Sequence, residues 1–358
     1  MASYIKSQLF NISLIARRGG IEVLLPLISS SLKRPNQSYI IYAPKGVQPD
    51  VYRGTDITRE YGGKGKLAAF WKFYFFCRKH KRDILHVYNI GPFFLLVARL
   101  ANVRKLVYSI HGTIYWNDNF ERIFRKFIWV RAISKRYRFT ANSGYSRDIF
   151  TSLVSRKVDP IILYNPINSA SFFIPAQPLK EAGSLVIVYT GRLVHGKNLF
   201  IWLTAAKEIS DKFPNAMFKV YGEGSLKQEL IAYALELGIS EKVSFEGFSS
   251  DISKAYQNAD LLLFLSEYES FGNVVAESIL CGTPVIASDI PSMREIFRNY
   301  QEFLVPLDEN LNANIIQKIE VLNVLKSKAL QAAQEFRIKF SLERHIKTIE
   351  SIYESLDS

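Results

Sequence analysis

Two glutamates flank a glycine in the stretch SEYESFGNVVAESILCGTPVIASD, residues 266–289. Glu269 and Glu277 are eight positions apart, and Gly272 lies between them. The run DLLLFLS before them is typical of a buried strand, and a helix is predicted to begin near Asn273. Backbone N–H groups at a helix N-terminus attract an anion, and a glycine lets the ligand approach closely. The stretch therefore predicts a phosphate cradle between two carboxylates that can accept hydrogen bonds from sugar hydroxyls.

The spacing of the two glutamates is not specific by itself. It recurs at Glu335 and Glu343, in a polar segment whose charged residues are predicted to form a solvated helix face. The first pair differs in its context, because a strand, a glycine-bearing loop, a helix and another strand follow one another there. The alternative interpretation is a charged loop followed by a glutamate that stabilises the positive end of a helix.

A pair of cations follows a second predicted strand, SLVIVYTG at residues 184–191. In the sequence GRLVHGKNL, Arg192 and Lys197 are five positions apart with Gly196 between them, so both side chains can turn toward one point. Two cations can neutralise a diphosphate in place of a metal ion. No Asp-x-Asp follows a strand to hold Mg²⁺, so we expect no metal site. Ordinary surface cations are the alternative.

The elements that would position these residues alternate between strand and helix. Such alternation predicts a doubly wound parallel sheet, in which ligands bind beyond the carboxyl ends of the strands. The first half repeats the pattern less clearly, with strands predicted in ILHVYNIG, KLVYSIHG and RFTANS. We therefore predict the α/β class, with two Rossmann-like, doubly wound domains that face each other across a cleft.

The boundary between the domains is predicted in SASFFIPAQPLKEAGS, residues 169–184. This segment has two prolines, a glycine and no periodicity, as linkers often do. The first domain is predicted to cover residues 1–168 and the second residues 184–339. A last helix, at about residues 340–358, is predicted to pack back on the first domain.

The order of motifs over residues 186–296 resembles the donor domain of retaining glycosyltransferases of family 4, the glycosyl transferases group 1 with the GT-B fold. The resemblance is carried by GRLVHGKN, VYGEGSLKQEL, VSFEGF and ADLLLFLSEYESFGNVVAESILCGTPVIASDIPSMREI. The first half is a looser match. There, RRGGIEVLLPLISSSL resembles the family's glycine pair, LVYSIHGTIYW its strand ending in the active-site histidine, and IILYNPIN its element before the linker.

The resemblance implies a role for each matched residue. The catalytic set would be His111, Arg192, Lys197 and Glu269, with the two cations on the donor diphosphate and the other two on the transferred sugar. Glu277 would bind the nucleotide ribose. The other donor-binding positions would be Gly19, Gly20, Gly191, Phe271, Gly272, Asn273 and Val274. Gly112 and Ser270 depart from the family's usual Asp and Gly, which affects the identity of the sugar more than the reaction.

The function implied is retaining transfer of a sugar from a nucleotide-diphosphate sugar, with UDP slightly favoured. The acceptor would be lipid-linked or a saccharide, in the assembly of a bacterial surface polysaccharide. No cofactor and no metal are expected. The alternative is a catalytically degenerate GT-B protein that binds sugar nucleotide or membrane lipid without transfer. The complete set of Arg192, Lys197, Glu269 and Glu277 favours activity.

The net charge of +13 is distributed unevenly along the chain. Residues 1–168 have 28 Lys and Arg against 9 Asp and Glu, whereas the remainder has 18 against 24. A basic half indicates an anionic partner, which could be a membrane, a phosphorylated ligand or nucleic acid. No helix-turn-helix, zinc or RNP-type signature accompanies the charge, so we expect no nucleic acid partner.

Two segments combine aromatic residues with cations, FWKFYFFCRKHKR at residues 70–82 and FERIFRKFIWVRAISKRYR at residues 120–138. The second is predicted to be one basic amphipathic helix, with Phe127 and Ile128 on its apolar stripe and Lys135 and Arg136 among its cations. Such a helix suits an anionic membrane surface. The alternative is that the apolar stripes of both segments pack on the first domain's sheet.

The two cysteines, Cys77 and Cys281, lie in apolar segments without metal-ligand spacing, which favours a reducing compartment. Near residue 20, Arg17 and Arg18 follow an apolar stretch instead of preceding it, unlike a secretion signal. We therefore expect a cytoplasmic protein, peripheral on the cytoplasmic face of the inner membrane.

Overall fold

The computed structural model describes residues 7–15, 20–42, 57–58, 66–88, 90–112, 119–154, 158–176 and 183–358. The chain forms two compact units. The first unit contains Met1–Pro166 and Leu342–Ser358, and the second contains Ile167–Ser341. The division assigns residues 167–183, between the two predicted domains, to the second unit.

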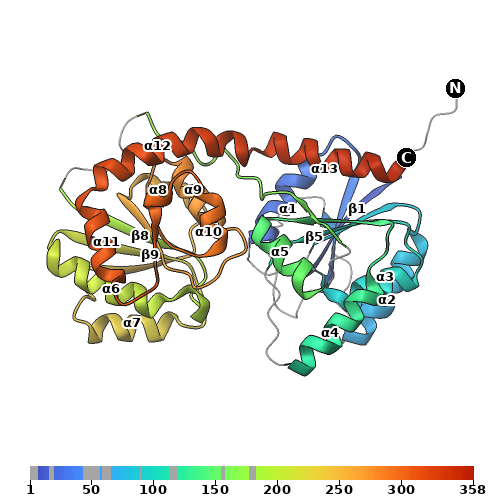
Figure 1. The fold of residues 1–358 in the computed structure, drawn as a ribbon, viewed down its shortest axis with the longest axis horizontal. Coiled ribbons are helices and arrows are strands. Elements are labelled where there is room, and N and C mark those ends of the chain that lie inside the picture. The colour runs from blue at the N-terminus through green and yellow to red at the C-terminus, as the bar shows by residue number, and fades with distance from the viewer. Residues whose placement is uncertain are drawn as a thin grey trace. The chain divides into compact units, whose positions relative to one another are not determined.

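The first unit has a seven-stranded parallel sheet in the order β3-β2-β1-β4-β5-β6-β7. Its strands are β1 (Leu9–Ile15), β2 (Asn36–Tyr42), β3 (Ile57–Thr58), β4 (Ile84–Tyr88), β5 (Lys105–Ile110), β6 (Tyr137–Ala141) and β7 (Ile161–Ile162). Its helices are α1 (Gly20–Ser31), α2 (Lys66–Lys79), α3 (Gly91–Leu100), α4 (Asn119–Ala132), α5 (Gly144–Leu153) and α13 (Leu342–Asp357). Figure 1 shows α2, α3 and α4 on one side of the sheet and α1 and α13 on the other.

The second unit has a six-stranded parallel sheet in the order β10-β9-β8-β11-β12-β13. Its strands are β8 (Leu185–Thr190), β9 (Ala216–Tyr221), β10 (Val243–Gly247), β11 (Leu261–Phe264), β12 (Val285–Ser288) and β13 (Leu304–Val305). Its helices are η2 (His195–Lys197), α6 (Leu199–Lys212), α7 (Lys227–Glu236), α8 (Ser253–Gln257), α9 (Asn273–Leu280), α10 (Pro291–Ile296), η3 (Gln301–Phe303), α11 (Leu311–Glu320) and α12 (Leu322–Lys339). The prediction of the α/β class with two Rossmann-like sheets is confirmed.

The central strands of both sheets are covered on both faces, which explains their continuous apolar runs. In β8, every residue from Val186 to Thr190 is buried, and all four residues of β11 are buried. Figure 1 shows α6, α7 and α11 on one side of this sheet and α8, α9 and α12 on the other. The strands therefore form a fixed frame, and the loops at their ends carry the exposed polar residues.

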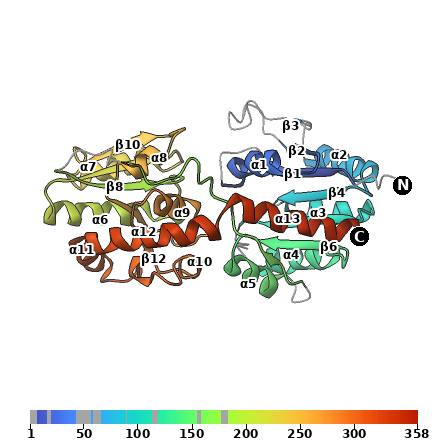
Figure 2. The same ribbon diagram turned by 90° about the horizontal axis from the view of Figure 1, so that it is seen from above.

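The last helix, α13, belongs to the first unit although the second unit separates it from the rest of that unit in sequence. Its buried residues Ile346, Ile349, Ile352 and Tyr353 recur at helical spacing. Ile349 and Ile352 join Leu9 and other strand residues in one apolar cluster. Figure 2 shows α13 lying along the sheet of the first unit. Burial of this stripe joins the C-terminal end to the first unit.

The predicted helix over residues 120–138 is too long at its end. α4 ends at Ala132, and the backbone N–H of Tyr137 donates to Ser134 in a turn. Tyr137 then pairs with Leu106 at the start of β6. Lys135 and Arg136 therefore lie in a turn rather than on the helix.

The predicted apolar stripe of this helix is also corrected. Ile128 is buried, whereas Phe127 is 51% exposed, so only part of the predicted stripe packs on the sheet. The periodicity of a short, densely aromatic segment did not reveal which ring faces the sheet.

Candidate functional site

The strand order of the second unit brings two of the predicted motifs together. β8 is the first strand of this unit, and its neighbours are β9 on one side and β11 on the other. Chain connections therefore run in opposite directions from β8 and β11, and such a switch point is where open α/β sheets bind ligands. The GRLVHGKNL loop follows β8 and the EYESFG loop follows β11. The motifs therefore lie at the carboxyl ends of neighbouring strands.

Glycines shape the loop that follows β8. Gly191 has a φ of +147°, and its backbone N–H donates to Tyr221 at 3.0 Å. A Cβ on Gly222 would overlap the Gly191 carbonyl, and a Cβ on Gly224 would overlap the Leu193 carbonyl. The GEG sequence after β9 thus lets two loops pack backbone against backbone. The contacts that require these two glycines are seen only in the structure, although two glycines after a strand do indicate that another segment approaches the backbone closely.

The loops after β8 and β11 also contact each other. A Cβ on Gly196 would overlap the Tyr268 ring, so only glycine lets that ring lie against η2. The backbone N–H of Glu267 donates to the Gly196 carbonyl at 3.3 Å. These contacts place Lys197 beside Glu269.

Lys197 and Glu269 form an ion pair between the Nζ and Oε2 atoms. Their side chains are 15% and 21% exposed, so both ends of the pair still meet solvent. The Lys197 ammonium also lies 5.5 Å from the centre of the Phe264 ring. The two motifs thus meet through opposite charges that a ligand can separate.

Arg192, the other predicted cation, lies in the same loop after β8. Its side chain is exposed, and no carboxylate among the described residues forms an ion pair with it. Its carbonyl accepts a hydrogen bond from the Tyr189 hydroxyl at 2.9 Å, which fixes the backbone. The convergence of the two cations on one point stays a prediction.

The loop after β11 ends at Gly272, which precedes α9 and has a φ of +89°. A Cβ there would lie 2.7 Å from Cε of Met293, so a side chain would collide with α10. No side chain caps the helix. Phe271 is buried with its ring 5.2 Å from that of Phe340, whereas Asn273 and Val274 in the first turn are partly exposed. The prediction of a helix start at Asn273 is confirmed.

Glu277 lies in the second turn of α9 and is held by a buried hydroxyl chain. The Tyr256 hydroxyl donates to Oε2 of Glu277 at 3.0 Å and lies 2.9 Å from Oγ1 of Thr190. Burial raises the pKa of Glu277 to about 7, although the hydrogen bond from Tyr256 opposes this rise. Glu277 is therefore a carboxylate that titrates near neutral pH. Tyr256 lies 21 positions away on α8, and no sequence pattern marks it as part of the site.

His111 directly follows β5 in the first unit. Its Nδ1 lies 3.1 Å from Oδ1 of Asn165, so the imidazole donates its proton there. The His111 ring is also 5.7 Å from that of Tyr88. Burial lowers the pKa of His111 to about 3, and the nearby His345 is the second cause of this fall. The hydrogen bond with Asn165 acts in the opposite direction. His111 is therefore neutral at physiological pH.

Two predicted site positions, Gly19 and Gly20, follow β1 in the sequence. Gly19 lies outside the described residues, and Gly20 is the first residue of α1. Asn165, which orients His111, belongs to the IILYNPIN element, but its pairing with a residue 54 positions earlier has no sequence signal.

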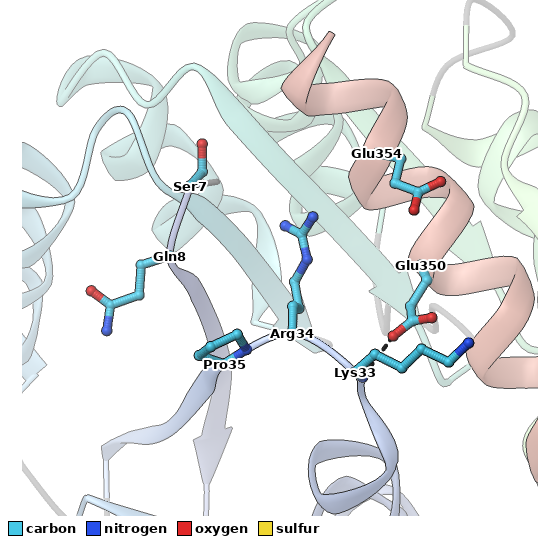
Figure 3. Close-up of a pocket in the computed structure, with 7 residues that line it drawn as sticks. All are labelled: Ser7, Gln8, Lys33, Arg34, Pro35, Glu350 and Glu354. Atoms are coloured by element: carbon cyan, nitrogen blue, oxygen red, sulfur yellow. Dashed lines mark hydrogen bonds between the residues drawn. The ribbon is translucent and has the colours of Figure 1, made fainter. Parts of the chain in front are cut away.

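A cavity of about 390 Å³ lies elsewhere on the first unit (Figure 3). It is lined by Ser7, Gln8, Lys33, Arg34, Pro35, Glu350 and Glu354, which come from the amino ends of β1 and β2 and from α13. Arg34 pairs with Asp357 at 3.0 Å, and the Lys33 backbone N–H donates to Glu350 at 2.7 Å. Cations and carboxylates balance there, at the opposite end of the sheet from His111. We assign it no role in the site.

Two features are absent from the described part of the chain. No three His, Cys, Asp or Glu side chains in that part are grouped to hold a metal ion. None of its helices is long and apolar enough to cross a membrane.

The two parts of the chain match two different family models. Residues 171–334 match the family model described as glycosyl transferases group 1, and residues 18–171 match the one described as glycosyltransferase family 4. The two models together cover most of the chain. The protein therefore belongs to the group 1, family 4 glycosyltransferases, whose GT-B fold its two sheets display.

Similar proteins include transferases that act on different sugars. An N-acetylgalactosamine-N,N'-diacetylbacillosaminyl-diphospho-undecaprenol 4-alpha-N-acetylgalactosaminyltransferase of Campylobacter jejuni is 27% identical, over 75% of this chain and 79% of that protein. The O-antigen chain mannosyltransferase RfbU of Salmonella typhimurium is 24% identical, over 67% of this chain and 71% of that protein. The structure of HepE from Anabaena with UDP-glucose has a TM-score of 0.81 at 20% identity, covering 98% of this chain and all of that one.

Proposed function

We propose that this protein is a retaining glycosyltransferase that uses a nucleotide-diphosphate sugar, with UDP as the favoured nucleotide. The acceptor is a lipid-linked or saccharide molecule in the assembly of a bacterial surface polysaccharide. The name of the Campylobacter relative, which specifies a diphospho-undecaprenol acceptor, supports the lipid-linked alternative. The UDP-glucose bound to the similar HepE structure supports the nucleotide.

The observation that carries the proposal is the ion pair of Lys197 and Glu269 at the carboxyl ends of β8 and β11. In the free protein each side chain neutralises the other. A nucleotide sugar offers both of them better partners, since its diphosphate attracts the lysine and its hydroxyls donate to the glutamate. Donor binding would thus replace one ion pair with two charge-assisted contacts.

The groups nearby suit the departure of the diphosphate. Negative charge grows on the leaving phosphate as the bond to the sugar breaks, and preorganised donors stabilise it there. Lys197, Arg192 and the start of α9 would supply these donors without a divalent metal. The acceptor would attack from the same face as the leaving group, which retains the configuration of the sugar. Glu277 would accept hydrogen bonds from both ribose hydroxyls.

His111 fits a supporting role. With a pKa of about 3, its imidazole is neutral at neutral pH and lacks the second proton that a general acid would deliver. A neutral imidazole can still accept or donate a hydrogen bond. We therefore propose that His111 orients a sugar hydroxyl and does not act as a general acid.

We further propose that the protein acts as a peripheral protein on the cytoplasmic face of the inner membrane. A lipid-linked acceptor is confined to the membrane, and the basic first half of the chain suits an anionic surface.

Thermal stabilisation by a panel of UDP-, GDP- and ADP-sugars tests the proposal. A UDP-sugar should raise the melting temperature, because a ligand that binds only the folded state stabilises it. Glu277→Gln should reduce the rise. The proposal is contradicted if no nucleotide sugar raises the melting temperature of the wild type at millimolar concentration.

A further inference from the structure

The outer surface of helices α2, α3 and α4 carries side chains that sugar transfer does not use. The inner surfaces of these helices pack on the sheet through buried residues, Phe73 and Cys77 of α2, Leu95 and Ala98 of α3, and Trp129 of α4. α3 contacts both α2 and α4, and the three form one layer (Figures 1 and 2). The sheet is therefore already covered, and packing on it does not account for the outward-facing residues.

Large apolar side chains are concentrated on this outer surface. Trp71 and Phe75 of α2 are each 63% exposed, and their stacked rings are 6.2 Å apart. Among the described residues of the first unit, six of the seven exposed large apolar side chains lie on these helices. The six are Trp71, Phe75, Phe93, Leu100, Phe127 and Val130, and the seventh is Ile161. Gathered exposure of this kind marks an interaction surface, whereas single exposed apolar residues do not.

Cations lie among these apolar side chains. The exposed cations of the three helices are Lys72, Arg78, Lys79, Arg99, Lys126 and Arg131. None of the side chains described in these helices is an aspartate or glutamate. The Arg131 guanidinium lies 3.2 Å from the centre of the Phe127 ring, so charge and aromatic surface occur at the same place. Among the side chains that the structure describes, the outer surface therefore combines aromatic residues with positive charge alone.

We propose that this outer surface of α2, α3 and α4 is the face that enters the headgroup region of an anionic bilayer, with Trp71 and Phe75 as its anchors. Aromatic rings favour the boundary between headgroups and acyl chains, and the surrounding cations attract lipid phosphates. An acidic protein partner could pair with the cations, but acidic side chains would not account for the stacked aromatic rings that point outward beside them. The inference rests on the proposed function in one respect, because membrane binding would bring the protein to a lipid-linked acceptor.

Flotation with lipid vesicles tests this placement. The wild type should bind vesicles of phosphatidylcholine mixed with phosphatidylglycerol, bind pure phosphatidylcholine far less, and dissociate as salt rises. Trp71→Ser with Phe75→Ser should weaken binding at least tenfold. The matched control is Ile231→Ser with Leu235→Ser on α7, which removes apolar residues that are 40% and 68% exposed beside Glu229 and Glu236. The control should bind like the wild type.

Three further measurements complete the test. All variants should keep the melting temperature and UDP affinity of the wild type, because the changed residues are exposed and vesicle binding needs neither donor nor acceptor. Quenching of tryptophan fluorescence by brominated lipid should fall strongly in Trp71→Phe. The inference is overturned if the wild type ignores anionic vesicles, if the α2 double variant binds as tightly as the wild type, or if quenching persists unchanged without Trp71. If the wild type binds anionic vesicles but does not bind UDP, the proposed function is contradicted and the membrane inference is not.

Discussion

The ionisation of Glu277 should control how tightly the protein binds its nucleotide. A ribose offers two hydroxyl donors, and only the carboxylate form of the glutamate can accept both. Because burial raises the pKa of Glu277 to about 7, the free protein holds a mixture of both forms at neutral pH. Affinity for free UDP should therefore be complete above pH 8 and should fall as the pH drops through about 7.

The expected size of the effect follows from the fraction ionised. Each pH unit below the pKa reduces that fraction about tenfold, which corresponds to about 1.4 kcal/mol of binding free energy. Glu277→Gln should remove this dependence. At pH 8 it should also weaken UDP binding by about 1.5–3 kcal/mol, the usual contribution of hydrogen bonds to a charged group.

Tyr256→Phe separates positioning from direct binding. The Tyr256 hydroxyl donates to Glu277 and thereby lowers its pKa against the effect of burial. Without that donor, the pKa of Glu277 should rise further, and the pH at which UDP affinity is half lost should move upward. Affinity well above that pH should recover toward the wild-type value.

Isothermal titration calorimetry with UDP from pH 5.5 to pH 9 measures these effects. The phosphates of UDP also titrate in this range, so the ratio of wild-type to Glu277→Gln affinity isolates the contribution of the side chain. Parallel pH profiles for wild type and Glu277→Gln would refute the reasoning, because Glu277 would then not sense the ligand. An unshifted midpoint in Tyr256→Phe would remove the tyrosine from its positioning role.

Three other predictions concern the loops. Lys197→Met should lower the rate of sugar transfer about a hundredfold or more through loss of a cation at the leaving group. Lys227→Met, which breaks the ion pair between Lys227 of α7 and Glu223, should leave the steady-state rate unchanged. Transfer should persist in EDTA, and dependence on added Mg²⁺ in the same assay would contradict the cation account. Gly272→Ala should cost about 1–2 kcal/mol in a denaturant titration and also weaken UDP binding, because a left-handed residue is strained and the start of α9 must move. Gly238→Ala, also left-handed but with open space around it, should lose stability and keep UDP affinity.

Much of the second unit could be predicted because its strands and turns have local signals. The apolar run of β8 indicates a strand buried on both faces, and Gly272 before α9 indicates a helix start that needs a left-handed residue. The two motifs that follow β8 and β11 could be identified in the same way. Their placement at neighbouring strand ends follows from the strand order of a doubly wound sheet.

The contacts between these motifs could not be predicted, because they depend on tertiary packing. The pairing of Lys197 with Glu269 joins residues 72 positions apart, and no local pattern indicates it. Nothing in the sequence around Tyr256 indicates that its hydroxyl donates a hydrogen bond to Glu277. A buried tyrosine on a short helix resembles any other core residue until the strands on either side are placed.

The first unit was harder for another reason. Its helices are aromatic on several faces, so periodicity does not distinguish the buried Phe73 from the exposed Phe75. The end of α4 at Ala132 depends on the pairing of Tyr137 with Leu106, which is a long-range contact. The same ambiguity hid the outward-facing rings on α2.

The most direct test of the central claim is transfer itself. Labelled UDP-, GDP- and ADP-sugars would be incubated with the protein and a bacterial lipid extract, and the label would be followed into the lipid fraction. The account predicts that one UDP-sugar labels the lipid with the wild type, that Lys197→Met labels it about a hundredfold more slowly or worse, and that the new linkage keeps the configuration of the donor sugar. Binding of nucleotide sugar without any transfer, to the lipid extract or to a panel of saccharide acceptors, would contradict it and indicate a degenerate, binding-only protein.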